Sequence, residues 1–334
     1  MKKQKLLITG GAGGIGSVFI NQLDDKFEID IVDNLHNGSL GNIKNKNINF
    51  IQADISEDST YKLLKYNYDF VFHFAAISSL PFCESNKELA FKYNFLGTYK
   101  LIEFCRDNNI KNFCFSSTSA IYENNDEKVF NENLAVKPDL IYPLSKKFSE
   151  ELLYSYSKNY GMNIIILRFF NVFGPNQDIK RKSPPLLNYL IREFYLDNSP
   201  TLHSDGKQSR DYIYVKDLVN LFLKILENPK TGIFNVCSGK LLSVNEILNY
   251  VLEYFNKNLN DVLWRDPSNL WDNHKELFQG HFSLSKERVS KEALKFSLGD
   301  NSKISETYNW SPQTDFRNLI FETIDESIEI FKNS

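Results

Sequence analysis

The sequence predicts an α/β protein, with a doubly wound parallel β-sheet followed by a smaller C-terminal lobe. Three observations lead to this prediction. Short runs of β-branched and aromatic residues alternate with longer helix-like segments through the first half of the chain, as in sheets covered by helices. The runs are continuously apolar, as strands buried on both faces are. A glycine-rich turn directly follows the first run.

Six strands are expected in the first half of the chain. They span residues 5–9, 28–32, 47–52, 70–74, 111–116 and 163–168. Between them, residues 87–106 and 145–158 carry apolar side chains at three- and four-residue spacing. This spacing predicts amphipathic helices that cover the faces of the sheet.

The regular alternation ends near Gly174 and Pro175, where turn-rich sequence begins. The elements expected beyond this point are helices near residues 217–226 and 244–256 and a strand at residues 233–236. We therefore divide the chain into residues 1–174, which form the sheet, and residues 175–334, which form mainly the lobe. The lobe is expected to close over the sheet and not to fold independently.

Composition and charge exclude several classes of protein. The 334 residues include 39 lysines and arginines against 42 aspartates and glutamates, whereas nucleic-acid binding usually requires a basic excess. The four cysteines form no C-x-x-C pair, which fits a reducing compartment and predicts no metal site. Glycines interrupt the first apolar run, and no longer run follows. We expect a cytoplasmic protein with no nucleic-acid or membrane partner.

The glycine-rich turn between Thr9 and Gly16 predicts a dinucleotide site. Its glycines recur at a G-x-x-G-x-x-G spacing, and the absence of side chains lets the backbone approach a pyrophosphate where the next helix begins. A turn that serves only close packing is the alternative.

Asp33 ends the second strand about 20 residues further on, where a carboxylate can accept the hydroxyls of an adenosine ribose. It would repel a 2′-phosphate, which favours NAD over NADP, although Asp33 is also a residue type that caps loops. Asp54 and Ile55 follow the third strand, within reach of an adenine, but an aspartate there is a common turn residue as well.

Tyr142 and Lys146 lie four residues apart at the start of an expected helix, so both side chains can lie on one face. Oxidising an alcohol needs a base, which a tyrosinate can provide. Lowering a tyrosine pKa from about 10 to about 7 takes roughly 4 kcal/mol, which a unit charge about 4 Å away supplies at an effective dielectric constant of about 20. Ser116, Ser117 and Thr118 offer a hydroxyl beside this pair. For the Tyr142 and Lys146 pair, the alternative is a surface tyrosine packed on the aliphatic part of a lysine. For the Ser116–Thr118 segment, the alternative is an ordinary turn after a strand.

Taken together, these features resemble the extended short-chain dehydrogenase/reductases, the family of NAD-dependent nucleotide-sugar epimerases and dehydratases. The resemblance covers nearly the whole chain. Further matching segments are Asp33-Asn34-Leu35, His73-Phe74-Ala75-Ala76, Asn94 with Gly97-Thr98, residues 168–175 and residues 210–215. The resemblance implies a Rossmann-type fold with bound NAD and a C-terminal lobe that binds a nucleoside-diphosphate sugar.

The resemblance also implies roles for individual residues. Thr118 would orient the sugar hydroxyl, Tyr142 would be the base and Lys146 its supporting ammonium, while Asn171 and Arg210 would contact the diphosphate. The implied cofactor-binding residues are Gly10, Gly13, Gly14, Ile15, Asp33, Asn34, Asn37, Gly38, Asp54, Ile55, Phe74, Ala75, Ala76, Asn94, Ser116, Tyr142, Lys146 and Phe169. The implied substrate-binding residues are Ser79, Thr118, Asn171, Leu187, Leu202, His203 and Arg210. A salt bridge to Asp211 or Asp217 is the alternative role of Arg210.

Departures from the family pattern narrow the reaction. The 4,6-dehydratases place Asp and Glu immediately after the catalytic threonine, whereas this chain has Ser119 and Ala120. Neither readily protonates a departing hydroxide, so dehydration is disfavoured. Oxidation at C4 of the sugar remains, either as a 4-epimerase or as a 4-dehydrogenase.

Other departures concern the sugar side. The second diphosphate arginine of the family would fall near Ser290 and Lys291, with Arg288 the nearest guanidinium, and Glu123 replaces a glycine that is usual beside the sugar. Residues 262–282, which contain Trp264, Arg265, Trp271 and His274, are loosely similar to bacterial enzymes that act on capsule or lipopolysaccharide sugars, such as C4-oxidising enzymes of GDP-heptose. We assign these tryptophans no role.

Two alternatives of other kinds stay open, namely an NADH-dependent 4-keto-sugar reductase and a non-catalytic NAD-binding regulatory or scaffold protein. The base of the substrate, whether UDP, GDP or dTDP, also stays open. By analogy with the family, we expect a homo-oligomer, a dimer or a tetramer.

Overall fold

The computed structural model describes residues 3–177, 181, 184–203, 205–265 and 296–332. Its central feature is a seven-stranded sheet in which all neighbouring strands pair in parallel. The strands across the sheet are β11 (Gly232–Val236), β7 (Asn163–Phe169), β5 (Asn112–Thr118), β4 (Phe70–His73), β1 (Gln4–Thr9), β2 (Phe27–Asp33) and β3 (Ile48–Gln52). The six strands expected in the first half of the chain are confirmed.

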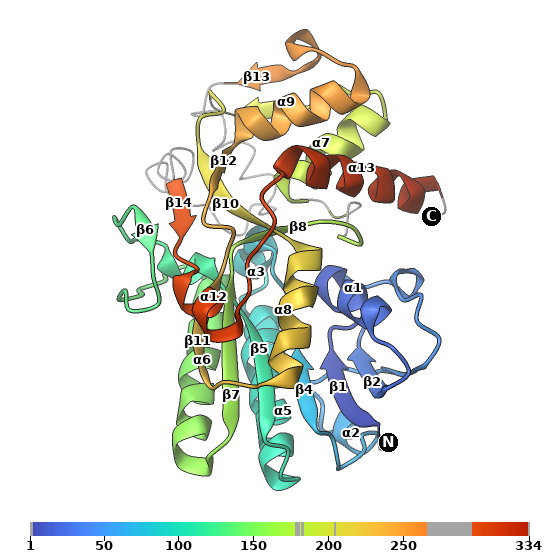
Figure 1. The fold of residues 1–334 in the computed structure, drawn as a ribbon, viewed down its shortest axis with the longest axis vertical. Coiled ribbons are helices and arrows are strands. Elements are labelled where there is room, and N and C mark those ends of the chain that lie inside the picture. Colours follow the sequence, from blue (N-terminus) through green and yellow to red (C-terminus); the bar gives the residue numbers. More distant parts are fainter. Residues whose placement is uncertain (1–2, 178–180, 182–183, 204, 266–295, 333–334) are drawn as a thin grey trace.

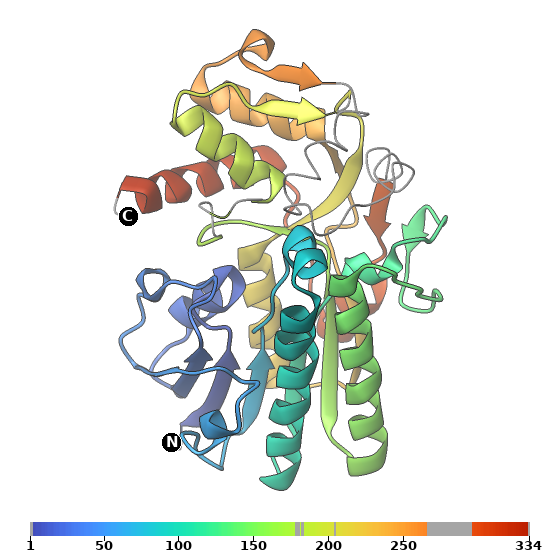
Figure 2. The same ribbon diagram turned by 180° about the vertical axis from the view of Figure 1, so that it is seen from behind.

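Helices cover both faces of this sheet. Those toward the viewer in Figure 1 are α1 (Gly14–Gln22) and α8 (Val215–Glu227), and those toward the viewer in Figure 2 are α5 (Gly97–Asp107) and α6 (Ile141–Tyr160). Phe19 of α1 packs edge-on against Phe222 of α8 with 5.1 Å between ring centroids. Leu101 of α5 and Leu153 of α6 are buried in a second core on the opposite face. This arrangement confirms the doubly wound, Rossmann-type α/β fold.

The single helix expected over residues 87–106 is interrupted. It consists of α4 (Lys87–Phe91), a π-helical turn η2 (Lys92–Leu96) and α5. The wider turn carries Asn94, whose buried amide accepts a hydrogen bond from the Ile77 N–H and donates to the Ile77 carbonyl. A buried polar side chain that must meet a loop therefore overrides the regular helical period.

The smaller lobe lies above the carboxyl ends of the strands (Figure 1). Its five-stranded sheet contains β6 (Val129–Phe130), β8 (Asn171–Phe173), β10 (Ser209–Tyr214), β12 (Leu241–Ser243) and β14 (Phe296–Gly299). Above it, β9 (Thr201–His203) pairs with β13 (Leu263–Arg265), next to α7 (Leu186–Tyr195), α9 (Val244–Phe255) and α13 (Phe316–Lys332). The remaining short helices among the described residues are η1 (Leu40–Asn42), α2 (Asp58–Tyr61), α3 (Leu80–Ser85), η3 (Ser119–Tyr122), η4 (Leu259–Asp261) and α12 (Ser302–Tyr308).

Two elements expected in the lobe lie instead with the central sheet. The helix expected near residues 217–226 is α8, which covers one face of that sheet. The strand expected at residues 233–236 was placed in the lobe, but it is β11, the seventh strand of the central sheet, and it pairs with β7. The chain therefore leaves the sheet after β7, contributes to the lobe, and returns through α8. A short apolar run predicts a strand, but its pairing partner is far away in sequence and leaves no local trace.

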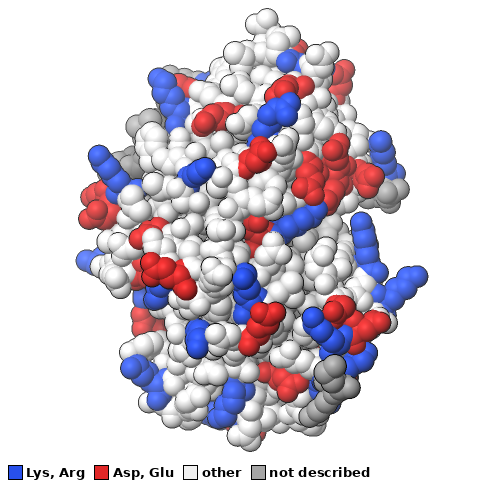
Figure 3. Space-filling view, viewed as in Figure 1, with Lys and Arg blue, Asp and Glu red and all other residues white. Residues whose placement is uncertain are grey.

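The surface charge and the character of the helices agree with the near-balance of charges and the short apolar runs in the sequence. On the face shown in Figure 3, lysine and arginine side chains are interspersed with aspartate and glutamate. Among the described residues, no helix combines the length and the apolar character that a bilayer span requires.

Candidate active site

A cavity of about 1310 Å³ runs along the carboxyl ends of the sheet strands and continues beneath the lobe. Its floor is formed by residues at the ends of β1, β2, β4, β5 and β7, and its far wall by residues of α7, β9 and β10. In open parallel sheets this edge is where ligands bind, because the loops that follow the strands converge there.

The glycine turn after β1 forms one end of the cavity. Gly10 has a φ of +71°, and a Cβ atom there would lie 2.5 Å from the Ala75 backbone nitrogen. At Gly16 a Cβ atom would lie 2.5 Å from the Gly10 carbonyl oxygen. Helix α1 begins at Gly14 and has no side-chain cap. The turn thus needs glycine for its own conformation and leaves helix N–H groups facing the cavity, which fits a dinucleotide pyrophosphate.

Asp33 lies beside this turn at the end of β2. Its carboxylate accepts hydrogen bonds from the N–H groups of Ala12, at 2.9 Å, and Leu35, at 2.8 Å. Burial raises the pKa of Asp33, while these two hydrogen bonds lower it. Asp33 therefore fixes the glycine turn and also lines the cavity. Its contact with an adenosine ribose stays a prediction.

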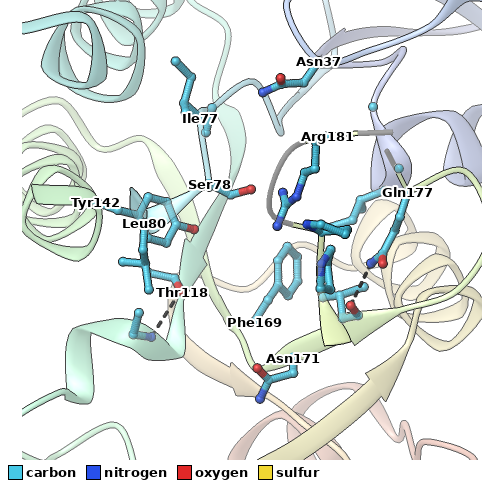
Figure 4. A pocket seen from close by; sticks show the side chains of 18 of the residues that line it. Asn37, Ile77, Ser78, Leu80, Thr118, Tyr142, Phe169, Asn171, Gln177 and Arg181 are labelled. Carbon is cyan, nitrogen blue, oxygen red and sulfur yellow. Dashed lines mark hydrogen bonds between the residues drawn. The ribbon is translucent and has the colours of Figure 1, made fainter. Parts of the chain in front are cut away.

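Thr118, Tyr142 and Lys146 meet at the opposite end of the floor. Thr118 ends β5, Tyr142 is in the first turn of α6, and Lys146 follows one turn later. The Lys146 Nζ donates to the Ser116 carbonyl at 2.7 Å and lies 4.5 Å from the centroid of the Phe115 ring. Figure 4 shows the Tyr142 and Thr118 side chains on the same side of the pocket. All three residues line the cavity.

Burial dominates the electrostatics of this corner. It raises the pKa of Tyr142 to about 12, although the Thr118 hydroxyl and the Arg181 charge lower it. It also lowers the pKa of Lys146 to about 7, against the opposing effect of Glu150. From the sequence we expect Lys146 to lower the pKa of Tyr142. In the protein alone, burial disfavours the charged forms of both residues, because neither charge keeps enough solvent.

A buried ion pair holds α6 against the sheet. Glu150, two turns after Tyr142, accepts from Arg168 of β7 at 2.7 Å and 3.1 Å, and it also accepts from the Ser117 hydroxyl. Arg168 donates further to the Tyr122 hydroxyl at 2.8 Å. Because every polar group in this cluster is hydrogen-bonded, the pair fixes the helix that carries Tyr142 and Lys146.

The substrate side of the cavity is built on β8 and β10. The Asn171 amide donates to the Asp211 backbone carbonyl at 2.9 Å. Arg210, the residue before Asp211, lines the cavity. The Asp211 carboxylate accepts four hydrogen bonds, two from Ser238 and one each from Gly239 and Gly299, yet burial raises its pKa to about 6. Asp211 therefore binds loops together.

Nearly all of the residues singled out from the sequence line this one cavity. The structure brings together Gly10, Gly13, Gly14, Ile15, Asp33, Asn34, Asn37, Gly38, Asp54, Ile55, Phe74, Ala75, Ala76, Ser116, Thr118, Tyr142, Lys146, Phe169, Asn171, Leu187, Leu202, His203 and Arg210.

Asn94 and Ser79 are not part of the lining. The Asn94 amide is used by Ile77 and by the Ser145 hydroxyl, behind the cavity wall. The Ser79 hydroxyl accepts from the Phe82 N–H at the start of α3. Both residues hold the walls together rather than face a ligand in this structure.

Sequence reasoning missed several polar lining residues. They are Ser78, Gln177, Arg181, Asn188, Tyr189, Arg192, Gln208 and Ser297. Figure 4 shows Arg181 extending into the pocket near Gln177. A run of basic residues after Gly174 is the available signal for Arg181, whereas the others come from loops, helix α7 and strand β14 without a motif.

Arg288, Ser290 and Lys291, near which the second diphosphate arginine was expected, lie outside the described residues, as do Trp271 and His274. Trp264 and Arg265 lie in β13, where they pair with Leu202 and His203 of β9. Arg265 lines the cavity.

Comparison with known proteins identifies a family and several similar proteins. The model of the NAD dependent epimerase/dehydratase family matches residues 6–237. A relative from Methanocaldococcus jannaschii, provisionally named a UDP-glucose 4-epimerase, is 34% identical over 249 residues, 74% of this chain and 81% of that protein. The UDP-N-acetylglucosamine 4-epimerase of Methanobrevibacter ruminantium, solved with UDP-N-acetylmuramic acid, has a TM-score of 0.86 at 30% identity and covers 99% of this chain and 100% of its own. The Thermus thermophilus UDP-glucose 4-epimerase, solved with NAD, has a TM-score of 0.81 at 26% identity, with 97% and 98% covered.

Proposed function

This chain belongs to the NAD-dependent epimerase/dehydratase family, and from that premise we propose that it is a 4-epimerase of a nucleoside-diphosphate sugar. It is an enzyme with NAD as its cofactor. The observation that carries the proposal is that the glycine turn, Thr118, Tyr142 and Lys146 line one cavity with Arg210. A dinucleotide site, a base and a cation suited to phosphate therefore share one binding space.

The chemistry requires a proton and a hydride to leave the sugar together. Bound NAD supplies the hydride acceptor for the hydrogen on C4. Tyr142, as the phenolate, takes the proton of the C4 hydroxyl, and Thr118 orients that hydroxyl. Return of the hydride to the opposite face of C4, with return of the proton from Tyr142 to the ketone oxygen, would give the C4 epimer, an isomer of unchanged mass.

The remote part of the substrate supplies the positioning. Arg210 suits a diphosphate because its planar guanidinium can engage two oxygens at once. Anchoring the nucleotide leaves the sugar near Tyr142, which turns binding energy into rate. Two structural neighbours are named as 4-epimerases of UDP-sugars, which supports UDP as the first nucleotide to test. GDP and dTDP are the other outcomes of the test.

The residues after Thr118 argue against a 4,6-dehydratase. Ser119 and Ala120 begin η3, and the Ala120 N–H donates to the Thr118 hydroxyl at 3.1 Å. No acid stands at these two positions to protonate a departing hydroxide. A 4-dehydrogenase, which would release the ketone and need a separate oxidant for its NADH, remains the second outcome of the experiment below.

The test is to load the protein with NAD and to present UDP-, GDP- and dTDP-hexoses in turn, with the free nucleotides as controls. We expect one sugar to be converted to an isomer of equal mass with no net gain in NADH absorbance. A product lighter by two hydrogens with accumulated NADH would instead identify a 4-dehydrogenase. If no sugar is converted, either to an isomer or to an oxidised product, the catalytic proposal is wrong and a non-catalytic NAD-binding protein is favoured.

The biological setting and assembly state are proposals as well. The loose similarity of residues 262–282 to enzymes of capsule sugars supports a role in bacterial surface polysaccharide synthesis. A homo-oligomer is supported by exposed aromatic side chains on α5 and α6, where Tyr99, Phe148 and Tyr154 are 40%, 45% and 54% exposed. Sedimentation of the purified protein tests it, and a monomer at micromolar concentration would contradict it.

A further inference from the structure

The helix that carries Tyr142 begins without a local cap. Its N-cap residue is Leu140, whose side chain accepts no hydrogen bond, and Pro143 in the first turn has no N–H. Helices normally rely on Ser, Thr, Asp or Asn at this position to satisfy the free N–H groups. Something else must therefore hold the start of α6 in place.

Two buried carboxylates from distant segments take over this task. One oxygen of Glu123, Oε1, accepts from the N–H groups of both Asp139, at 2.7 Å, and Leu140, at 2.9 Å. Glu84 Oε1 accepts from the Ile141 N–H at 2.6 Å. Three successive backbone donors just before Tyr142 thus point at two negative groups, which also complement the positive end of the helix dipole.

The origin of each carboxylate matters for the reactive corner. Glu123 directly follows η3, the turn that Thr118 caps through its hydroxyl. It therefore connects the segment that carries Thr118 to the helix that carries Tyr142. Glu84 comes from a separate segment, α3. Both glutamates are nearly inaccessible to solvent, at 4% and 5% exposure, so each is retained at a desolvation cost that its hydrogen bonds must offset.

We propose that Glu123 and Glu84 are positioning residues that clamp the start of α6 and so fix the Tyr142 hydroxyl relative to Thr118. This inference rests on the proposed function, since it assigns the clamp to the proton-transfer step. A displacement of the helix start by about 1 Å is enough to lower a rate about a hundredfold. The clamp also explains why this chain carries a glutamate at position 123, the departure that the sequence left without a role.

Two substitutions at one position separate positioning from direct catalysis. Glu123→Ala removes the acceptor of two N–H groups. Glu123→Gln removes the charge and the acidic proton but keeps one carbonyl oxygen, which is all that the shared Oε1 contact needs. Glu132→Ala is the matched control, because Glu132 also accepts a backbone N–H, that of Asn235 at 2.7 Å, but this N–H belongs to β11 and not to the start of α6.

The measurements are kcat and KM for the sugar nucleotide converted by the wild type, together with hydrogen exchange of the amides of residues 139–141. We expect Glu123→Ala to lower kcat by about tenfold to a hundredfold with KM nearly unchanged, and to lose protection at those amides. Glu123→Gln should recover most of both, and Glu132→Ala should change neither. Glu84→Ala should deprotect Ile141 and lower kcat in the same way.

Three outcomes overturn the clamp. Loss of protection in Glu123→Ala with wild-type kcat would show that the contact does not position Tyr142. Loss of kcat in Glu123→Gln with protected amides would make Glu123 itself the acid or base. Unchanged amide protection in Glu123→Ala would show that Glu123 does not hold the start of α6. This result would not depend on any activity of the wild type, because hydrogen exchange is measured without substrate. Absence of sugar conversion by the wild type would instead count against the proposed function.

Discussion

The two ends of the cavity floor are built in opposite ways. The cofactor end consists of one continuous turn, residues 10–16, in which close backbone contacts exclude side chains. The reactive end brings Thr118 and Tyr142 together from different elements and holds them with Glu84, Glu123 and Glu150. The cofactor end depends on the absence of side chains at the glycines of one short segment. The reactive end depends on hydrogen bonds between residues that are far apart in the sequence.

The two ends also differ in how they treat charge. At the cofactor end, the backbone N–H groups of the glycine turn provide a positive potential, and the carboxylate beside them, Asp33, is held by the N–H groups of Ala12 and Leu35. At the reactive end, burial shifts the pKa of Lys146 down to about 7 and that of Tyr142 up to about 12. A substitution at one end should therefore affect binding, and a substitution at the other should affect rate.

The sharpest test of this division is Tyr142→Phe. Removing the base should lower kcat by about a hundredfold to ten-thousandfold, while NAD stays bound because the glycine turn is untouched. Rapid-mixing measurements of NADH absorbance and a count of bound NAD distinguish the two effects. Tyr154→Phe, on the exposed side of the same helix, should behave as the wild type. Near-normal turnover in Tyr142→Phe would remove the assignment of the base.

Gly10→Ala probes the opposite end. The added methyl would meet the Ala75 nitrogen at 2.5 Å with φ at +71°, and the left-handed backbone alone costs a non-glycine residue about 1–2 kcal/mol. We expect NAD affinity to fall by at least about tenfold, and the protein to be less stable. Gly41→Ala is the control, since its methyl would meet only Ser39 Oγ at 3.5 Å. An unchanged Kd for NAD in Gly10→Ala would show that the turn does not bind the cofactor.

The same contrast explains how much the sequence predicts. The glycine spacing and the four-residue spacing of Tyr142 and Lys146 are patterns within short segments of the sequence. These residues and Asp33 line the cavity, as the patterns predict. The placement of β11 depends on pairing with β7, the π-turn at Asn94 on a contact with Ile77, and the lowered Lys146 pKa on burial. None of these has a local pattern, because each is decided by partners that fold against it from elsewhere in the chain.

Lys146→Met tests whether burial of charge sets the stability of the reactive end. The folded-state pKa of about 7 lies below the ordinary value of 10.5, so the unfolded chain binds the extra proton between these values. The cost to folding is therefore complete below about pH 7 and fades as pH rises toward about 10.5. Replacing the ammonium by an apolar side chain should stabilise the ligand-free protein by about 1–4 kcal/mol at pH 7 while abolishing turnover.

Urea unfolding at pH 7 and pH 10 measures this effect, with Lys147→Met as the control. Lys147 forms an ion pair with Glu151 on the surface of the same helix, so its loss should leave activity intact and stability nearly unchanged. If Lys146→Met is less stable than the wild type at both pH values, the contacts of Nζ with Ser116 and Phe115 outweigh desolvation.

The smallest expected effect is a shift in pH dependence. The Thr118 hydroxyl lowers the pKa of Tyr142, and the base must be deprotonated, so kcat/KM for sugar oxidation should rise with pH up to that pKa. Thr118→Val removes the hydroxyl and should move this limb to higher pH, by less than about one unit, because a neutral hydrogen bond contributes about 0.5–1.5 kcal/mol. Thr118→Ser should restore the limb. A limb that stays in place in Thr118→Val would mean that the hydroxyl orients the sugar without acting on the base, and a shift to lower pH would contradict the sign of the interaction itself.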